Sequence, residues 1–368
     1  MTSFLTSDVE ADAVSAPPLL RMTQTTPTVL WNDSADPVEL AAAIGWGAVG
    51  ATCNPVLALS ALKAHRDRWR DRVCTLAAER PSDSESDIGW QLVRELSVES
   101  AALLEPIYLE HEGRNGRLSV QTDPRLHRDE QGLVAQAVEF DSLAANIIVK
   151  IPATEVGVRA MEEATYRGVS INATVSFTVA QVVAVAEAVE RGLARREAEG
   201  LDTSRMGPVA TIMVGRLDDW LKHVTEGEQV TTDPGVLDWA GVACFKRAHE
   251  IFLERGYRTR LLSAAFRNHL HWSELVGGDV VISPPYPWQV RLNASGIDPL
   301  PRLEQPIPSA ILASLCRLPE FRKAYDENGM SHSEFASFGP TLRTLRQFLA
   351  ANADLEKFVR DVIVPDPD

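Results

Sequence analysis

The sequence predicts a single α/β domain built as a closed (β/α)8 TIM barrel, with extra helices on its C-terminal side. Eight short apolar runs alternate with helical patterns, which is typical of repeated βα units, and eight such units are the number that closes a barrel. A doubly wound open sheet is the alternative, but it usually has fewer strands, and no GxGxxG motif follows any run. The predicted strands are Thr28–Asp33, Ala48–Asn54, Arg117–Thr122, Asn146–Pro152, Val169–Thr174, Val209–Gly215, Arg260–Phe266 and Asp279–Pro284.

Apolar residues at helical spacing predict a helix after most of these strands. Asp36 and Asn54 each precede a proline, which places a capping side chain before a proline at the first helical position. Gly168 and Gly256 fall just past predicted helix ends, where a left-handed residue is favoured. The principal predicted helices are Val38–Ile44, Ile88–Leu104, Gly132–Leu143, Val156–Tyr166, Val179–Glu199 and Val236–Arg255, with longer loops at Arg80–Asp87 and Gly200–Pro208.

The chain divides into three predicted segments. Residues 1–26 are polar and contain prolines, so we expect a flexible N-terminal segment, and its acidic residues do not fit a signal peptide. Residues 27–285 hold the barrel. Residues 286–368 change to a helical pattern, which we interpret as an extension packed on the barrel rather than a second domain.

Composition excludes several partners and compartments. The 368 residues include 36 Lys and Arg against 51 Asp and Glu, a net charge of −15, which argues against nucleic acid or an anionic membrane as partner. No apolar run approaches the length of a membrane span. The four cysteines have no CxxC spacing, which fits a reducing cytoplasm, and the pair His269 and His271 is weak evidence for a metal site without a third ligand.

The stretch Asn146–Pro152 places one amine, Lys150, among branched aliphatic residues. In a buried parallel strand the ammonium form is penalised, so the pKa of the lysine falls and a free amine is available to attack a ketone. The alternative is a lysine that reaches from the strand end to a surface carboxylate. This stretch alone does not separate the two interpretations.

Polar residues gather at the carboxyl ends of the predicted strands, where barrel enzymes carry their chemistry. Each has a structural alternative: Asp33 and Asn54 can be helix caps, and Asn172 and Thr174 can belong to a turn. As a set they indicate a site. In chain order they are Asp33, Asn54, Gln121, Lys150, Asn172, Thr174, Thr211, Met213, Arg216 and Arg267.

The same segments resemble the transaldolase family over roughly residues 27–285. The matching motifs, in the order of that family, are Trp31-Asn-Asp-Ser-Ala35, Ala51-Thr-Cys-Asn-Pro55, Val149-Lys-Ile-Pro152, Ile171-Asn-Ala-Thr-Val175, Met213-Val-Gly-Arg-Leu-Asp218, Asp233-Pro-Gly-Val236 and Ala264-Ala-Phe-Arg-Asn268. The resemblance implies a barrel of the class I aldolase type that works through a lysine Schiff base, with no metal and no organic cofactor. Lys150 falls on the lysine strand of that family, which favours the nucleophile interpretation.

The resemblance also implies roles for the other residues. Asp33 would be the acid and base for the substrate hydroxyl, and Thr174 would help to position the water that carries protons. Asn54, Asn172 and Thr211 would hold the hydroxyls of the three-carbon unit. Arg216 and Arg267 would clamp a terminal phosphate, since guanidinium groups match phosphate oxygens.

Three positions depart from the family pattern. Gln121 stands where transaldolases usually carry a glutamate that orients the relay water, and an amide cannot take up a proton. The fructose-6-phosphate aldolase branch also has glutamine there, together with a tyrosine on the sixth strand, where this chain has Met213. Ala265 replaces a common serine, so a phosphate would lose one hydroxyl donor.

The predicted activity is transfer of a dihydroxyacetone unit from a ketose or ketose phosphate to an aldose acceptor. One alternative is a lyase, like fructose-6-phosphate aldolase, that releases free dihydroxyacetone. Another is a catalytically silent sugar-binding barrel. The expected partner is a small sugar or sugar phosphate, with neither nucleic acid nor membrane, and a homodimer is among the open oligomeric states.

Overall fold

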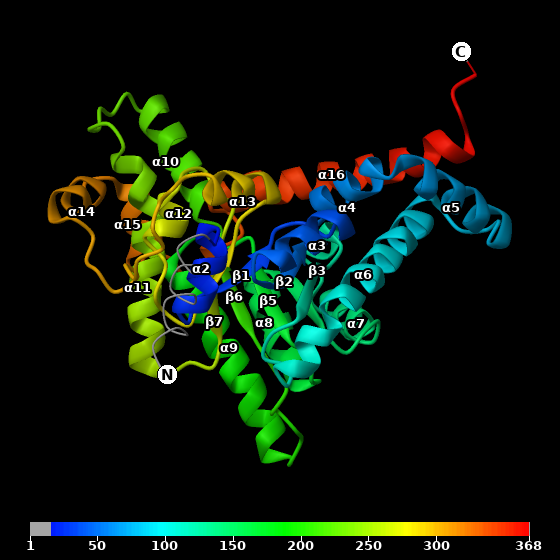
Figure 1. The fold of residues 1–368 in the computed structure, drawn as a ribbon, viewed down its shortest axis with the longest axis horizontal. Coiled ribbons are helices and arrows are strands. Elements are labelled where there is room, and N and C mark those ends of the chain that lie inside the picture. Colours follow the sequence, from blue (N-terminus) through cyan, green and yellow to red (C-terminus); the bar gives the residue numbers. More distant parts are fainter. Residues whose placement is uncertain (1–15, 368) are drawn as a thin grey trace, which may run out of the picture.

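The computed structural model describes residues 16–367, which form a closed barrel of eight parallel strands (Figure 1). Each strand pairs with the next along the chain, and β8 closes the ring by pairing Val281 with Val29 of β1. This confirms the predicted (β/α)8 barrel. The strands are β1 (Val29–Asn32), β2 (Ala48–Cys53), β3 (Arg117–Gln121), β4 (Ile147–Pro152), β5 (Ile171–Thr174), β6 (Val209–Ile212), β7 (Arg260–Ala264) and β8 (Val281–Ser283).

Helices cover the outside of the barrel. The predicted caps are confirmed, because the Asp36 and Asn54 side chains each accept two backbone N–H bonds at the start of a helix, and Gly168 and Gly256 have positive φ. The helices around the barrel are α3 (Pro37–Gly45), α4 (Pro55–Ala64), α5 (Arg66–Glu79), α6 (Glu85–Glu110), α7 (Glu130–Asp141), α8 (Glu155–Tyr166), α9 (Val179–Ala198), α10 (Val214–Gly227), α11 (Ala240–Arg255) and α12 (Leu270–Ser273), with short 3-10 turns η1 (Pro124–Leu126) and η2 (Val236–Trp239).

Three boundaries differ from the predictions. Residues 1–15 of the predicted flexible segment lie outside the described residues, but Pro18–Thr25 forms helix α2, with Leu19 and Met22 fully buried, so flexibility through residue 26 is wrong there. Helix α6 begins at Glu85, inside the predicted loop, because Ser84 and Asp87 form a capping box. The predicted strand from Val209 ends at Ile212, and α10 starts two residues later.

The barrel interior and the layer between strands and helices are separate apolar clusters. The interior cluster consists of Trp31, Ile148, Val209, Leu262, Ala264 and Val281, all at most 6% exposed. On β4 the alternate residues Val149 and Ile151 belong to the larger outer cluster, as strand alternation requires. Trp31 needs the glycine at position 50, where a Cβ would lie 2.5 Å from the indole ring.

The C-terminal extension is helical, as predicted. It contains α13 (Tyr286–Asn293), α14 (Ser309–Leu315), α15 (Pro319–Tyr325), η3 (His332–Glu334) and the long α16 (Gly339–Ile363). Helix α16 contacts α10 near its start and α4, α5 and α6 along the rest of its length. It lies across the end of the barrel at which the strands finish (Figure 1), where it also contacts residues just after β3 and β6. Within residues 16–367, no helix has the length and apolar character needed to cross a membrane.

Candidate active site

Lys150 points into the barrel. It lies two residues after Ile148 on β4, so the two side chains share a face of the strand, and Ile148 belongs to the interior cluster. Lys150 is 3% exposed. Burial lowers the pKa of its amine, and the positive charge of Arg216 acts in the same direction, whereas Asp33 and Cys53 oppose the shift. The structure therefore places an interior amine with a lowered pKa among charged groups of the predicted site.

The strand register surrounds Lys150 with polar side chains. Gln121 of β3 and Asn172 of β5 are its Cα partners on either side. The Asn172 amide donates to Ser119 Oγ at 2.9 Å and accepts from Thr211 Oγ1 at 2.8 Å, which fixes the orientation of the amide. Because an amide nitrogen carries two donors, one N–H of Asn172 stays available to a ligand.

The side chain of Gln121, beside Lys150, has a buried polar atom without a hydrogen-bond partner in the described residues. Its side chain is 3% exposed, and its Oε1 atom is buried without a hydrogen-bond partner in the described part of the chain. A buried amide oxygen of this kind usually bonds to ordered water. The structure thus provides an acceptor beside Lys150 that can hold a water molecule, although it cannot take up a proton.

Asp33 follows β1 directly and faces the same interior. Its Oδ1 accepts a hydrogen bond from Thr52 Oγ1 of β2 at 2.5 Å, and its charge acts on both Lys150 and Cys53. Burial raises the pKa of the Cys53 thiol to about 12, so this thiol stays protonated at neutral pH. Burial therefore disfavours the thiolate of Cys53, whereas it favours the neutral amine of Lys150.

Thr174 and Met213 meet at the ends of β5 and β6. Thr174 is fully buried and donates to Met213 Sδ at 4.0 Å, a weak bond to a poor acceptor. The hydroxyl of Thr174 can therefore turn toward a water or a substrate at little cost. Met213 is 6% exposed and supplies apolar bulk at the same level.

The structure gives Asn54 a structural task. Its Oδ1 accepts hydrogen bonds from the N–H groups of Val56 and Leu57 at 3.0 and 3.1 Å, and so caps α4. The helix-cap interpretation of Asn54 is therefore confirmed. The predicted contact with a substrate hydroxyl is untested, and it would fall to the amide nitrogen of this residue.

The two predicted phosphate-binding arginines differ in their surroundings. Arg216, on the first turn of α10, is largely buried, and burial followed by the charge of Arg267 lowers the pKa of its guanidinium. The side chain of Arg267 is 39% exposed and donates from Nε to Asp219 Oδ2 at 2.9 Å. Its charge is therefore partly balanced by a neighbouring carboxylate, whereas no ion pair of the described residues includes Arg216 within 4.0 Å.

A buried histidine supports the turn that carries Arg267. His271 Nε2 lies 2.7 Å from Asp218 Oδ2, with both side chains fully buried, and His271 Nδ1 accepts the backbone N–H of Arg267 at 3.0 Å. Ala265, in the same turn, has φ of +64°. His271 thus has a structural role, and no three His, Cys, Asp or Glu side chains among residues 16–367 gather where they could hold a metal.

The sequence did not single out Thr52 and Ser119, although both contact predicted site residues. Each is a small hydroxyl residue within an apolar strand, where serine and threonine are common for other reasons. The signal that would have found them is strand alternation, because Ser119 is two residues before Gln121 and shares its face. The same alternation places Thr52 on the interior face, because Thr52 is the Cα partner of Ser119 in the regular register of β2 and β3.

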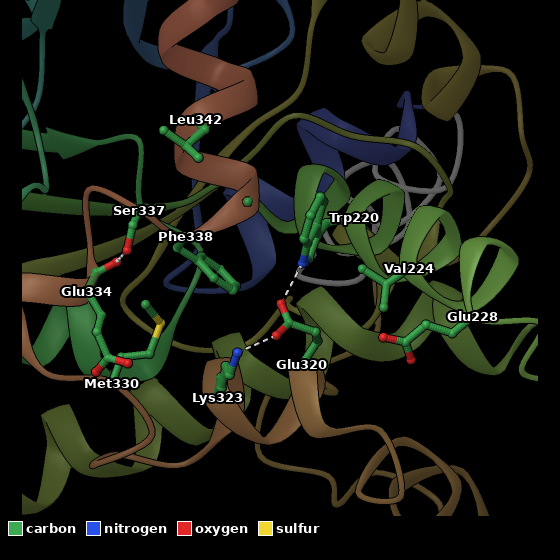
Figure 2. Close-up of a pocket in the computed structure, with 11 residues that line it drawn as sticks. Trp220, Val224, Glu228, Glu320, Lys323, Met330, Glu334, Ser337, Phe338 and Leu342 are labelled. Atoms are coloured by element: carbon green, nitrogen blue, oxygen red, sulfur yellow. Dashed lines mark hydrogen bonds and ion pairs between the residues drawn. The ribbon is translucent and has the colours of Figure 1, made fainter.

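A second feature is a surface groove of about 510 Å³, whose lining residues Figure 2 shows. It is formed by residues of α10, α15 and the start of α16, and Figure 2 shows Trp220 donating to Glu320, which also pairs with Lys323. None of the predicted site residues lines it. The groove is therefore not the candidate active site, which lies inside the barrel.

The fold and the site together define a (β/α)8-barrel enzyme whose polar layer surrounds one interior lysine. The family described as Transaldolase/Fructose-6-phosphate aldolase matches residues 30–298. A transaldolase from Thiobacillus denitrificans is 30% identical over 296 residues, which cover 74% of this chain and 81% of that protein. Transaldolase 2 of Streptomyces avermitilis is 30% identical over 55% of each chain, and a transaldolase of Saccharopolyspora erythraea is 35% identical over 47% of this chain and 46% of its own.

The chain therefore belongs to the transaldolase/fructose-6-phosphate aldolase family and is an enzyme of the transaldolase type. This confirms the resemblance carried by the sequence motifs. The part of the chain matched by the family ends before α14, so α16 lies outside it.

Proposed function

We propose that this enzyme transfers a dihydroxyacetone unit from a ketose, or ketose phosphate, to an aldose acceptor through a Schiff base on Lys150. The observation that carries the proposal is the interior position of Lys150, buried beside Asp33 in a layer of hydrogen-bonding side chains. A lysine whose amine has a lowered pKa is suited to attack a carbonyl carbon at neutral pH. The family and its named relatives support the same activity.

The chemistry then follows from the placement of the groups. The neutral Lys150 amine adds to the ketose carbonyl, and loss of water leaves an iminium ion. Asp33 takes the proton from the substrate hydroxyl as the carbon–carbon bond breaks, which releases an aldose and leaves an enamine on the lysine. Addition of the enamine to the acceptor aldehyde, followed by hydrolysis, completes the transfer.

The surrounding side chains have supporting parts in this proposal. The free donors of Asn172 and Asn54 and the hydroxyl of Thr211 orient the three-carbon unit. Gln121 holds the relay water through its unpartnered oxygen, and Thr174 shares that water. A small sugar or sugar phosphate is the proposed partner, and a cytoplasmic location stays a prediction.

A lyase is the second candidate, and Gln121 favours it. The fructose-6-phosphate aldolase branch also has glutamine at this position. In the lyase reaction the enamine takes up a proton at carbon, and water then hydrolyses the resulting iminium ion, which releases free dihydroxyacetone and restores the Lys150 amine. The two activities are distinguished by incubating the enzyme with ketose phosphate in the absence of an acceptor aldose. Release of free dihydroxyacetone at the rate of the complete reaction would replace transfer with the lyase assignment.

Borohydride trapping tests the Schiff base directly. We expect reduction in the presence of fructose 6-phosphate to add a stable three-carbon unit to the peptide that contains Lys150, because borohydride reduces the iminium ion to a secondary amine. Peptide mass mapping identifies the modified residue. An unmodified Lys150 peptide across a panel of ketoses and ketose phosphates would instead favour the catalytically silent barrel.

Gln121→Glu is expected to change both rate and pH dependence. A carboxylate at this position can take up the proton that an amide cannot, so the rate of transfer should rise at its optimum. The new negative charge beside Lys150 also favours the ammonium form and raises the pKa of the amine. Measurement of kcat from pH 6 to 10 should therefore show a higher maximum that lies at higher pH, and an unchanged maximum would mean that the relay carboxylate is not limiting.

A further inference from the structure

The guanidinium group of Arg216 is held by helix α16. Arg216 Nη2 donates to Gln347 Oε1 at 2.6 Å, and Nη1 lies 3.4 Å from Thr344 Oγ1. The group also lies 6.0 Å from the ring centroid of Phe348. The Nε atom of Arg216 is buried and has no partner in the described residues, so these contacts with α16 fix where the guanidinium points.

These contacts orient the positive charge of Arg216 without cancelling it. Gln347 and Thr344 are neutral acceptors, whereas a glutamate or aspartate at either position would form an ion pair. Arg216 consequently still acts on the interior, where its charge lowers the pKa of Lys150. Arg267, in contrast, is paired with Asp219. Of the two arginines, Arg216 is the one without an ion pair among the described residues, and Asp219 and Asp33 act on its charge only at longer range.

The position of α16 relative to α10 is itself closely fixed. A Cβ at Gly339, the first residue of α16, would lie 2.2 Å from the Trp220 ring, so only glycine permits this approach. The guanidinium of Arg343 also stacks 5.1 Å from the Trp220 centroid. Trp220 is one helical turn after Arg216 on α10, and Figure 2 shows it beside the start of α16. The contacts of Gly339 and Arg343 with Trp220 therefore fix the position of α16, and with it the position of Gln347 next to Arg216.

We propose that Gln347, assisted by Thr344, is a positioning residue that makes this site selective for ketoses with an anionic end, such as a phosphate. It does so by holding Arg216 on a neutral acceptor, so that the guanidinium keeps a full charge for the anion. This inference deepens the proposed function and depends on it for the identity of the substrate. The proposal gives helix α16 a role in the site, although α16 lies outside residues 30–298, the part of the chain that the family matches.

Gln347→Glu tests the proposal with a nearly isosteric change. The carboxylate would pair with Arg216 and balance its charge, so we expect KM for fructose 6-phosphate to rise roughly tenfold or more, the loss of one charge-assisted bond. KM for unphosphorylated fructose should change less than about twofold, because that substrate offers no anion to Arg216. The half-maximal pH of borohydride trapping on Lys150 should also move upward, since the charge that lowers its pKa is offset.

Two further variants complete the test. Ala353→Glu adds the same charge to an exposed position of α16 and should leave both KM values unchanged. Gln347→Leu keeps the position neutral but removes the acceptor, so it should raise KM for the phosphorylated sugar alone, by roughly threefold. If Gln347→Glu does not fold by circular dichroism, Gln347→Leu carries the test. Equal changes for both sugars, or no change for the phosphorylated one, would overturn the proposal.

Binding of inorganic phosphate separates this inference from the proposed function. Isothermal titration should show weaker phosphate binding to Gln347→Glu than to the wild-type enzyme, whether or not a ketose reacts. Failure of wild-type Lys150 to form any adduct would contradict the Schiff-base proposal but leave the phosphate comparison to decide the role of Gln347. Equal phosphate affinity of the two proteins would contradict that role alone.

Discussion

Lys150→Met is expected to abolish transfer, with a loss in kcat on the order of 10⁴-fold or more, as removal of a covalent nucleophile usually gives. No borohydride adduct should form on the β4 peptide. The fold should persist and become more stable at neutral pH, because the change replaces a buried amine by an apolar side chain of similar length. Steady-state kinetics, peptide mapping and thermal unfolding measure the three effects.

The pH dependence of this stabilisation has a definite sign. Burial lowers the pKa of Lys150 in the folded protein below the ordinary lysine value of 10.5, so between these two values the unfolded chain binds more protons than the folded one. Wild-type stability therefore rises with pH across that window, and below it the full cost of burying the amine is present. The advantage of Lys150→Met in Tm should grow as pH falls below 10.5 and should level off once the pH lies below the pKa of Lys150 in the folded protein.

Lys246→Met is the matched control, because Lys246 is the other buried lysine of the described chain, at 5% exposed. Its amine donates to Glu274 and to the backbone oxygens of Arg302 and Gln305. Methionine there leaves these acceptors unpaired, so we expect lower stability with catalysis retained. Loss of turnover in both variants, or a wild-type rate in Lys150→Met, would remove Lys150 from the reaction.

Asp33→Asn is expected to lower kcat by roughly 10²–10⁴-fold, the usual contribution of a general acid–base group. The amide keeps the size of the side chain but cannot accept the hydroxyl proton during carbon–carbon cleavage. The initial Schiff base should still form, so borohydride should trap the intact ketose in place of the three-carbon unit. Mass spectrometry of the Lys150 peptide distinguishes these two adducts.

Thr52→Val provides the comparison for Asp33. It removes the hydroxyl that donates to Asp33 Oδ1 while the carboxylate stays, so a loss of about tenfold is expected from weaker positioning. An equal loss in the two variants would show that Asp33 acts through its hydrogen bond with Thr52. A three-carbon adduct in Asp33→Asn would assign the proton transfer to another group.

Most of the barrel could be predicted because its signals are local. Each strand is a short apolar run, and the capping residues Asp36 and Asn54 mark helix starts in the sequence itself. Helix α2 was missed because its stability comes from burying Leu19 and Met22 against distant parts of the chain. Such tertiary contacts leave little trace in a polar, proline-containing segment.

The candidate site was only partly predictable, since the sequence gives the strand ends but not the contacts between them. The interior position of Lys150 follows from strand alternation, and the structure confirms it. The pairing of Arg267 with Asp219, by contrast, depends on how the turn after β7 is folded, where Ala265 adopts a positive φ. The hydrogen bond between Arg216 and Gln347 of α16 joins residues more than a hundred positions apart. No local sequence pattern predicts such a contact.

The apolar cluster around Trp31 and Ile148 determines from which side molecules can reach Lys150. It closes the barrel beneath the reactive amine, so sugar, water and protons share one entrance. On the proposed mechanism, the aldose released on cleavage therefore has to leave by that entrance before the acceptor aldehyde can come in.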